Sequence, residues 1–248
     1  MDKEKIKQSF SKSAKSYDEY ADIQKEMMLN LLNGISGKFK NVLDIGSGTG
    51  LLAKWMIEKF PEAEIVGMDI APGMVKYASL KHINPRIIFL NGDGEQMPFA
   101  DNVFDLIVSN AALQWMDYKK AIDEAARVIT SHGQFHFATF GSGTLKELKS
   151  AGFAVNNFPS DIELSDYLAK YFNDVCITKQ IIFKKYGNLH ELFLYLKKIG
   201  AQNPQEKISK GLFTKNKIER LAQKITSASF EVYYGVCKGS VLSSHLKT

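Results

Sequence analysis

The feature that most constrains this chain is the stretch 42–50, in which a short apolar run ends in Asp44 and glycines follow at positions 46, 48 and 50. This pattern predicts a buried strand, a tight turn and the start of a helix. Glycine lacks a Cβ and tolerates positive φ, so the backbone of such a turn can approach a ligand closely. The stretch therefore predicts a binding site at the carboxyl end of a strand.

The glycine spacing bears on which ligand this turn can accept. A dinucleotide site has the spacing G-x-G-x-x-G and places a pyrophosphate at the helix N-terminus. Leu51 stands where that pattern needs its third glycine, and Asp44 would repel a pyrophosphate. We therefore expect a ligand that carries positive charge and has no phosphate near the turn.

Strand-like and helix-like segments alternate along the first part of the chain. Two helices are expected first, followed by five strands with helices between them. This alternation predicts βαβ units and a parallel sheet that helices cover on both faces. The expected helices span about 3–15, 19–33, 49–60, 72–80 and 117–129, and the expected strands span about 40–45, 64–69, 86–90, 104–109 and 133–140.

The second part of the chain has a different pattern, with two late strands and helices inserted between them. We expect helices over 144–151, 165–172, 188–199 and 215–225, and strands over 175–186 and 230–238. The prediction is one domain, 1–248, with a Rossmann-like, doubly wound, mostly parallel sheet of seven strands. It comprises an N-terminal helical cap (1–36), a binding core (37–140), substrate-side helices with a late strand and a helical lid (141–228), and a final strand (229–238).

Composition excludes several classes of protein. The net charge of +5 is mild, and the chain has only three arginines, so a nucleic-acid partner is disfavoured. No signal peptide or membrane span is expected, and two cysteines are consistent with free thiols in the cytoplasm. The five histidines form no ligand-like cluster in the sequence, so no metal site is expected.

Acidic and amide residues follow successive expected strands. Asp44 precedes the glycine turn, Asp69 ends the second strand, Asp93 and Gly94 follow the third, and Asn110 follows the fourth. In a doubly wound sheet, ligands lie beyond the carboxyl ends of the strands. Such groups suit a ribose, an amino group and an ammonium. Taken singly, Asp44 could stabilise the turn, Asp69 could cap a helix and Asp93 could be a turn residue.

Residues 40–140 thus resemble the S-adenosylmethionine-dependent methyltransferases of the Rossmann-like class. The resemblance implies that Asp44 and the glycine turn bind the methionine part of the cofactor, Asp69 the ribose and Asp93 the adenine. The whole cofactor-binding set that it implies is Asp44, Gly46, Ser47, Gly48, Gly50, Asp69, Ile70, Met74, Asp93, Gly94 and Asn110.

Motifs beyond this cofactor-binding set narrow the resemblance from this class to one family. Those that contribute most are the stretch Ala112-Leu113-Gln114-Trp115 and the stretch Leu196-Lys197-Lys198-Ile199-Gly200-Ala201. With them, nearly the whole chain resembles the malonyl-acyl carrier protein O-methyltransferase family of biotin synthesis. The resemblance implies methyl transfer to the free carboxylate of a malonyl thioester on acyl carrier protein. Open alternatives are a methyltransferase of another small carboxylate or hydroxyl, and a non-catalytic protein that binds the cofactor.

A carboxylate acceptor is ionised at neutral pH, so its methylation needs no general base. It does need partners, because removing a carboxylate from water is costly. Candidates are Tyr17, Trp115 and Lys197, with Gln24 and Gln114 as weaker ones. The aromatic residues could instead be packing residues, and Lys197 a solvated lysine. An acidic carrier could be received by surface lysines, including Lys146 and Lys149.

Overall fold

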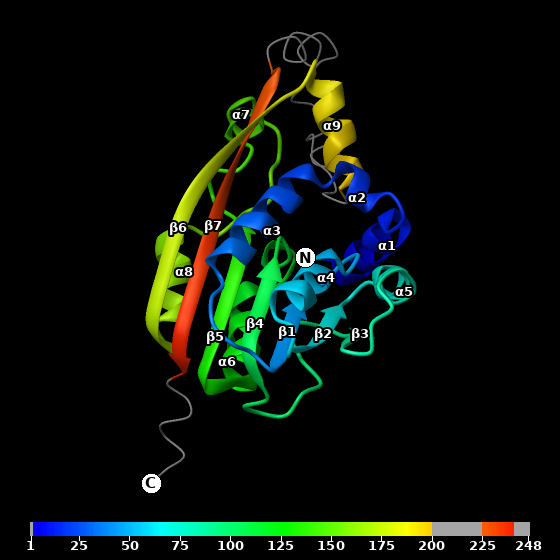
Figure 1. Ribbon diagram of the computed structural model, residues 1–248. Coiled ribbons are helices and arrows are strands. Elements are labelled where there is room, and N and C mark those ends of the chain that lie inside the picture. The colour runs from blue at the N-terminus through cyan, green and yellow to red at the C-terminus, as the bar shows by residue number, and fades with distance from the viewer. Residues whose placement is uncertain (1, 200–224, 241–248) are drawn as a thin grey trace.

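The sheet of this protein, seen in a computed structural model that describes residues 2–199 and 225–240, has the strand order β3-β2-β1-β4-β5-β7-β6 (Figure 1). Strands β1 to β5 pair in parallel, and β7 runs antiparallel between β5 and β6. The expected mostly parallel, seven-stranded sheet is confirmed in the described residues. Its strands are β1 (Asn41–Ile45), β2 (Glu64–Asp69), β3 (Ile87–Asn91), β4 (Phe104–Asn110), β5 (Ile129–Phe140), β6 (Phe172–Lys185) and β7 (Ser227–Ser240).

Helices cover both faces of the sheet, with one apolar core on each side (Figure 1). Val42 and Leu43 are neighbours on β1, both fully buried, and belong to different cores, because successive side chains of a strand point to opposite faces. Helices α3, α4 and α9 contribute to one core, and α6 and α8 to the other. The helices are α1 (Lys3–Ser13), α2 (Tyr17–Tyr20), α3 (Asp22–Gly34), α4 (Leu51–Lys59), α5 (Pro72–Lys81), α6 (Tyr118–Val128), α7 (Lys146–Ser150), α8 (Asp161–Leu168) and α9 (Leu189–Lys198), with a 3₁₀ turn at Leu113–Trp115.

Helix boundaries differ from expectation at several places, including α7, which begins at Lys146 instead of Thr144, and α1, which ends at Ser13. The helix expected from Thr49 begins at Leu51, because Gly50 adopts φ +78° and cannot be helical. The helix expected over 19–33 is divided at Ala21. The helix expected over 165–172 begins at Asp161, where Ser160 and Glu163 form a capping box, and β6 has begun by residue 172.

The N-terminal segment packs over the carboxyl end of the sheet. Gly73 N–H of α5 donates to Ser11 Oγ at 3.1 Å, and a Cβ on Gly73 would lie 2.6 Å from the Ser11 Cα. Thr49 Oγ1 donates to Asp18 at 2.7 Å, and the same carboxylate accepts from Lys81 Nζ at 2.7 Å. These contacts place α1 and α2 above the glycine turn.

The expected helix over 215–225 lies, except for its last position, outside the described residues, as do Gly200 and Ala201. Within the described part, the late strands form a long antiparallel ladder in which Phe172 pairs with Ser240 and Lys185 with Ser227. The described helices include none with the length and hydropathy needed to cross a membrane.

Candidate functional site

The turn after β1 has the backbone that its glycines predict. Gly46 and Gly48 have φ of +74° and +53°, which is the left-handed region. Gly46 N–H and Ser47 N–H both donate to Met68 O, at 2.7 and 3.0 Å, and tie the turn to β2. A Cβ on Gly46 would lie 2.2 Å from that of Ala112, whereas Gly48 lines a cavity and a Cβ there would have no heavy atom nearer than 4.0 Å. Gly48 is therefore where ligand and backbone can approach.

Asp69, at the end of β2, holds the turn in place. Its Oδ2 accepts from Gly48 N–H at 2.9 Å, and its Oδ1 accepts from Ala71 N–H at 2.8 Å. Burial raises the pKa of Asp69, although both backbone donors favour the ionised form. Each carboxylate oxygen keeps a further lone pair for a ligand in the same cavity.

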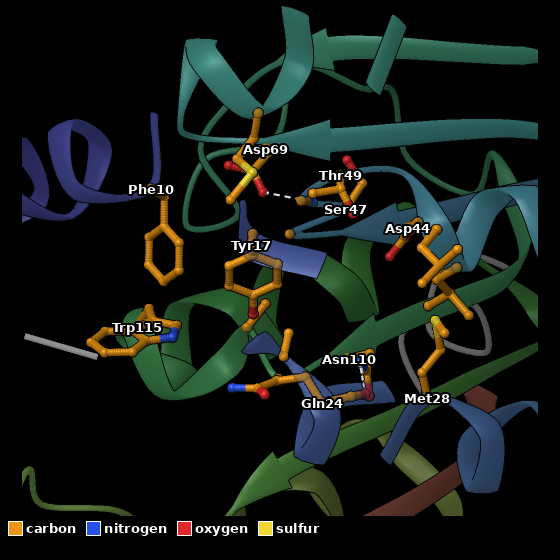
Figure 2. A pocket seen from close by; sticks show the side chains of 18 of the residues that line it. Phe10, Tyr17, Gln24, Met28, Asp44, Ser47, Thr49, Asp69, Asn110 and Trp115 are labelled. Carbon is orange, nitrogen blue, oxygen red and sulfur yellow. Dashed lines mark hydrogen bonds between the residues drawn. The ribbon is translucent and has the colours of Figure 1, made fainter. Parts of the chain in front are cut away.

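This first cavity contains several buried oxygen atoms that have no hydrogen-bond partner (Figure 2). Asp44 Oδ2, Asn110 Oδ1 and Gln24 Oε1 are acceptors that lack a donor, and Ser47 Oγ is also unpaired. Buried polar atoms are normally hydrogen-bonded, so the set calls for a ligand that brings N–H or O–H donors. An ammonium, which has donors only, matches these acceptors.

Asp44 has a strongly perturbed environment. Its side chain is 1 % exposed, and burial, with a smaller contribution from Asp69, raises its pKa to about 8. A positively charged ligand would reverse this effect, because an opposite charge favours the ionised carboxyl. The electrostatics and the unpaired acceptors therefore both favour a cationic ligand with N–H donors, and they fit a sulfonium that carries an amino-acid group.

A second cavity adjoins the first, and both are lined by Tyr17, Gln24 and Trp115. Figure 2 shows the Tyr17 ring between Asp69 and Gln24, with Phe10 and Trp115 beside it. The Phe10 ring packs edge-on against the rings of Tyr17 and Trp115, at centroid distances of 6.2 and 5.4 Å. Three aromatic side chains thus surround the place where the cavities meet.

The described residues that line the second cavity are all uncharged. Burial, together with Asp69 and Asp18, raises the pKa of Tyr17, so its hydroxyl stays protonated at neutral pH. Gln114 is held by the protein itself, since its Nε2 donates to Ala111 O at 2.7 Å and its Oε1 accepts from Thr139 at 3.1 Å. Gln24 Oε1 has no such partner.

The structure brings most of the expected cofactor residues to the first cavity. Asp93 does not line it: Lys3 Nζ of α1 lies 2.7 Å from Asp93 Oδ2 and 2.8 Å from Glu95. Burial opposes ionisation of Asp93, but Lys3 and the Glu95 N–H hold its pKa below the usual range. Gly50 and Gly94 also lie outside the lining. The expected residues that line the cavity are Asp44, Gly46, Ser47, Gly48, Asp69, Ile70, Met74 and Asn110.

Of the expected acceptor residues, Tyr17 and Trp115 line both cavities and Lys197 lines neither. Lys197 is exposed, near the end of α9, whereas Leu196 beside it faces the second cavity. Sequence reasoning assigned no role in the site to Phe10 and did not identify Asp18 as the partner of Thr49. Residues 18 and 49 come together only in the fold, so no local periodicity could have indicated their contact.

Comparisons with known proteins agree with this geometry. A family model described as "Methyltransferase domain" matches residues 43–137. A malonyl-[acyl-carrier protein] O-methyltransferase of Geobacter sulfurreducens is 31 % identical over 96 % of this chain and 99 % of its own length. One of Hahella chejuensis is 31 % identical over 96 % and 90 %. Among solved structures, the YcgJ protein of Bacillus subtilis matches with a TM-score of 0.63 at 18 % identity, over 87 % of this chain and 98 % of its own.

The sheet order, the glycine turn and the donor-poor cavity define an S-adenosylmethionine-dependent methyltransferase of the Rossmann-like class. The likeness to curated relatives extends through both terminal parts of the chain and is not confined to the methyltransferase domain. The chain belongs to the malonyl-[acyl-carrier protein] O-methyltransferase family.

The raised pKa of Asp44 makes cofactor binding depend on pH. Since the free protein binds a proton there below about pH 8, and the cationic cofactor favours the carboxylate, binding should release a proton. We expect affinity to rise with pH, by up to about tenfold per unit, between about pH 6 and 7.5. Between about pH 4 and 8 the folded protein keeps the Asp44 proton, whereas the unfolded chain, with a carboxyl pKa near 3.9, has released it. The stability of the folded protein therefore falls as pH rises through this range.

Calorimetry in two buffers of different ionisation enthalpy measures this proton release directly. The Asp44→Asn variant, which has no proton to lose, is the control and should bind with little dependence on pH. Equal proton release by the two proteins would contradict the assignment to Asp44.

Proposed function

We propose that this enzyme transfers the methyl group of S-adenosylmethionine to the free carboxylate of a malonyl thioester carried on acyl carrier protein, an early step of biotin synthesis. The observation that carries the proposal is the pair of adjoining cavities with a common wall of Tyr17, Gln24 and Trp115. One cavity suits the cationic cofactor, and the other suits an uncharged arm that ends in a carboxylate. The names of the curated relatives support the choice of acceptor.

For the cofactor, the proposal uses the unpaired groups of the first cavity. Asp44 Oδ2 and Asn110 Oδ1 accept from the methionine ammonium, and Asp69 accepts from the ribose hydroxyls. Ile70 and Met74, which follow Asp69, provide apolar surface for the adenine. When bound, S-adenosylmethionine supplies an electrophilic methyl group on a sulfonium. We also propose that Asp93 and Gly94 lie near the adenine, although they do not line the cavity. Lys3 donates a hydrogen bond to Asp93 and fixes its side chain.

For the acceptor, positioning and exclusion of water carry the catalysis. The carboxylate is ionised without help from the protein, so no base is needed. Tyr17 O–H, the Gln24 amide N–H and Trp115 N–H can donate hydrogen bonds to it from the wall between the cavities. Apolar side chains exclude water and keep the reacting atoms close. Lys197 has no role in this proposal, because it faces solvent.

A hydroxyl acceptor fits the second cavity less well. Its proton would have to be removed, and the described lining contains no histidine, carboxylate or lysine that could remove it. Tyr17 is unsuited as a base, since burial raises the pKa of its hydroxyl. The neutral lining therefore favours an acceptor that arrives already ionised.

Intact-mass measurement of loaded carriers tests the proposed function. The purified enzyme is incubated with S-adenosylmethionine and carrier protein that bears malonyl, succinyl or acetyl groups. We expect a gain of one methyl group on the malonyl carrier and none on the acetyl carrier, which has no free carboxylate. Transfer to a free small acid without transfer to any carrier would overturn the proposal.

We further propose that the enzyme works in the cytoplasm, where reduced thiols persist. Cys176 and Cys237 are both free in the structure. Disulfides form mainly in oxidising compartments, so two free thiols are consistent with this location. Fractionation of the source cells tests it.

A further inference from the structure

The edge of the sheet beside α7 has an exposed surface that combines apolar and basic side chains. Strand β6 is the outermost strand, and its Phe183 and Ile181 pair with Ser229 and Glu231 of β7. Directly paired residues of antiparallel strands point to the same face of a sheet. Ser229 Oγ donates to Glu147 of α7 at 3.0 Å, so α7 contacts this face of β7, although its buried Leu148 belongs to the core on the other face (Figure 1).

The register places further side chains on the same face. Lys179 pairs with Tyr233 and Lys185 pairs with Ser227, so both lie on the same face as the two apolar residues and flank them along β6. Helix α7 adds Lys146 and Lys149, both exposed. We call this set the β6–α7 surface: Lys146, Lys149, Lys179, Ile181, Phe183 and Lys185.

The apolar members of the β6–α7 surface are open to solvent. Phe183 is 67 % exposed and Ile181 is 48 % exposed. Large apolar side chains on an edge strand favour association with another molecule. Lys179 is partly neutralised, at 3.8 Å from Asp161 and 3.6 Å from Glu231. The other three lysines form no ion pair within residues 2–199 and 225–240, so their charge is available to a partner.

The β6–α7 surface is connected to the second cavity by the chain itself. Thr144 and Leu145 line that cavity and lead directly into α7. The loop that leaves α7 lines the cavity again at Ala154, Val155 and Asn156, and Asn156 is exposed to solvent. A partner held on α7 would therefore lie beside the segments that form the cavity wall.

We propose that the β6–α7 surface docks the acyl carrier protein, an inference that rests on the proposed function. The carrier is an acidic protein whose substrate hangs on a long flexible arm. Exposed lysines complement its negative charge, and Phe183 and Ile181 offer apolar contact at the centre of the interface. Docking here delivers the arm to the cavity wall formed by the loop after α7. Self-association through the same apolar strip is the competing occupant.

Charge reversal with two substrates tests this surface. The variant K146E/K149E is compared with wild type on malonyl-carrier and on malonyl-pantetheine, which has the same arm without the protein. We expect kcat/KM for the carrier to fall at least about tenfold, chiefly through KM, with loss of its salt dependence. The value for malonyl-pantetheine should not change. The control K38E/K40E alters the net charge equally at exposed lysines before β1, and should retain carrier activity.

The apolar part is tested by Phe183→Ser, which should also lower kcat/KM for the carrier alone. An equal loss with both substrates, or no loss with either, would overturn the docking surface. So would a Phe183→Ser protein that keeps full carrier activity but loses self-association in sedimentation, since the occupant would then be a second copy. If wild type methylates malonyl-pantetheine but not the carrier, docking fails while the reaction stands. If it methylates neither, the proposed function fails and this inference with it.

Discussion

Replacing Asp69 with asparagine should weaken binding of S-adenosylmethionine about 100-fold, or about 2.8 kcal/mol. The carboxylate accepts from Gly48 N–H and Ala71 N–H at the same time, and in the proposed function it also accepts from the ribose. An amide presents one oxygen, so its NH₂ group must face one of these two backbone N–H groups, donor against donor. Titration calorimetry measures the loss.

Asp105 offers a matched control for this variant. Its carboxylate accepts from Lys40 N–H at 2.8 Å and Asn41 N–H at 3.0 Å, at the start of β1 and away from both cavities. Asp105→Asn should lower stability without changing cofactor affinity. If the two variants weaken cofactor binding equally, the role of Asp69 is only structural.

Gly48→Ala should lower mainly the affinity for the cofactor, whereas Gly46→Ala should lower mainly the stability of the fold. Gly48→Ala places a methyl group in the first cavity without a clash, and its φ of +53° costs only about 1–2 kcal/mol of stability. We expect it to fold and to bind the cofactor at least about tenfold more weakly, because the methyl group occupies ligand space. Gly46→Ala forces a Cβ to 2.2 Å from that of Ala112 and should destabilise the fold by about 3 kcal/mol or more.

Thermal unfolding and cofactor titration of both variants separate these effects. The Gly46→Ala protein should lose most of its thermal stability margin, and Gly48→Ala should lose mainly affinity. A Gly48→Ala protein with wild-type affinity would show that the ligand does not approach this part of the turn.

The central part of the fold could be predicted because its signals are local. The run 64–69 is a strand that ends in an acid, and the structure has the same boundaries. Such parallel strands are buried on both faces and appear as continuous apolar runs, which is why Val42 and Leu43 are both fully buried. Helix starts were less predictable, since the left-handed backbone of Gly50 delays α4 and the Ser160 capping box advances α8.

The site could be predicted only as far as strand ends determine it. Asp44, Asp69 and Asn110 meet at one cavity because parallel strands end at the same edge of the sheet. Asp93 also follows a strand, but its ion pair with Lys3 joins residues far apart in sequence, which no local pattern encodes. Lys197 shows a different limit: its place on a helix was predicted correctly, but the direction that it faces depends on how α9 packs.

The contact of Ser11 with Gly73 has a consequence for the whole catalytic centre. The same length of chain that this contact fixes also carries Phe10, which lines the first cavity, and Tyr17, which lines both cavities, so one N-terminal segment contributes to both. A substitution that weakens the packing of α1 on α5 should therefore also alter the second cavity, although the substituted residue does not line that cavity. The first twenty or so residues thus contribute to both cavities, and a change among them alters the cofactor site and the acceptor site together.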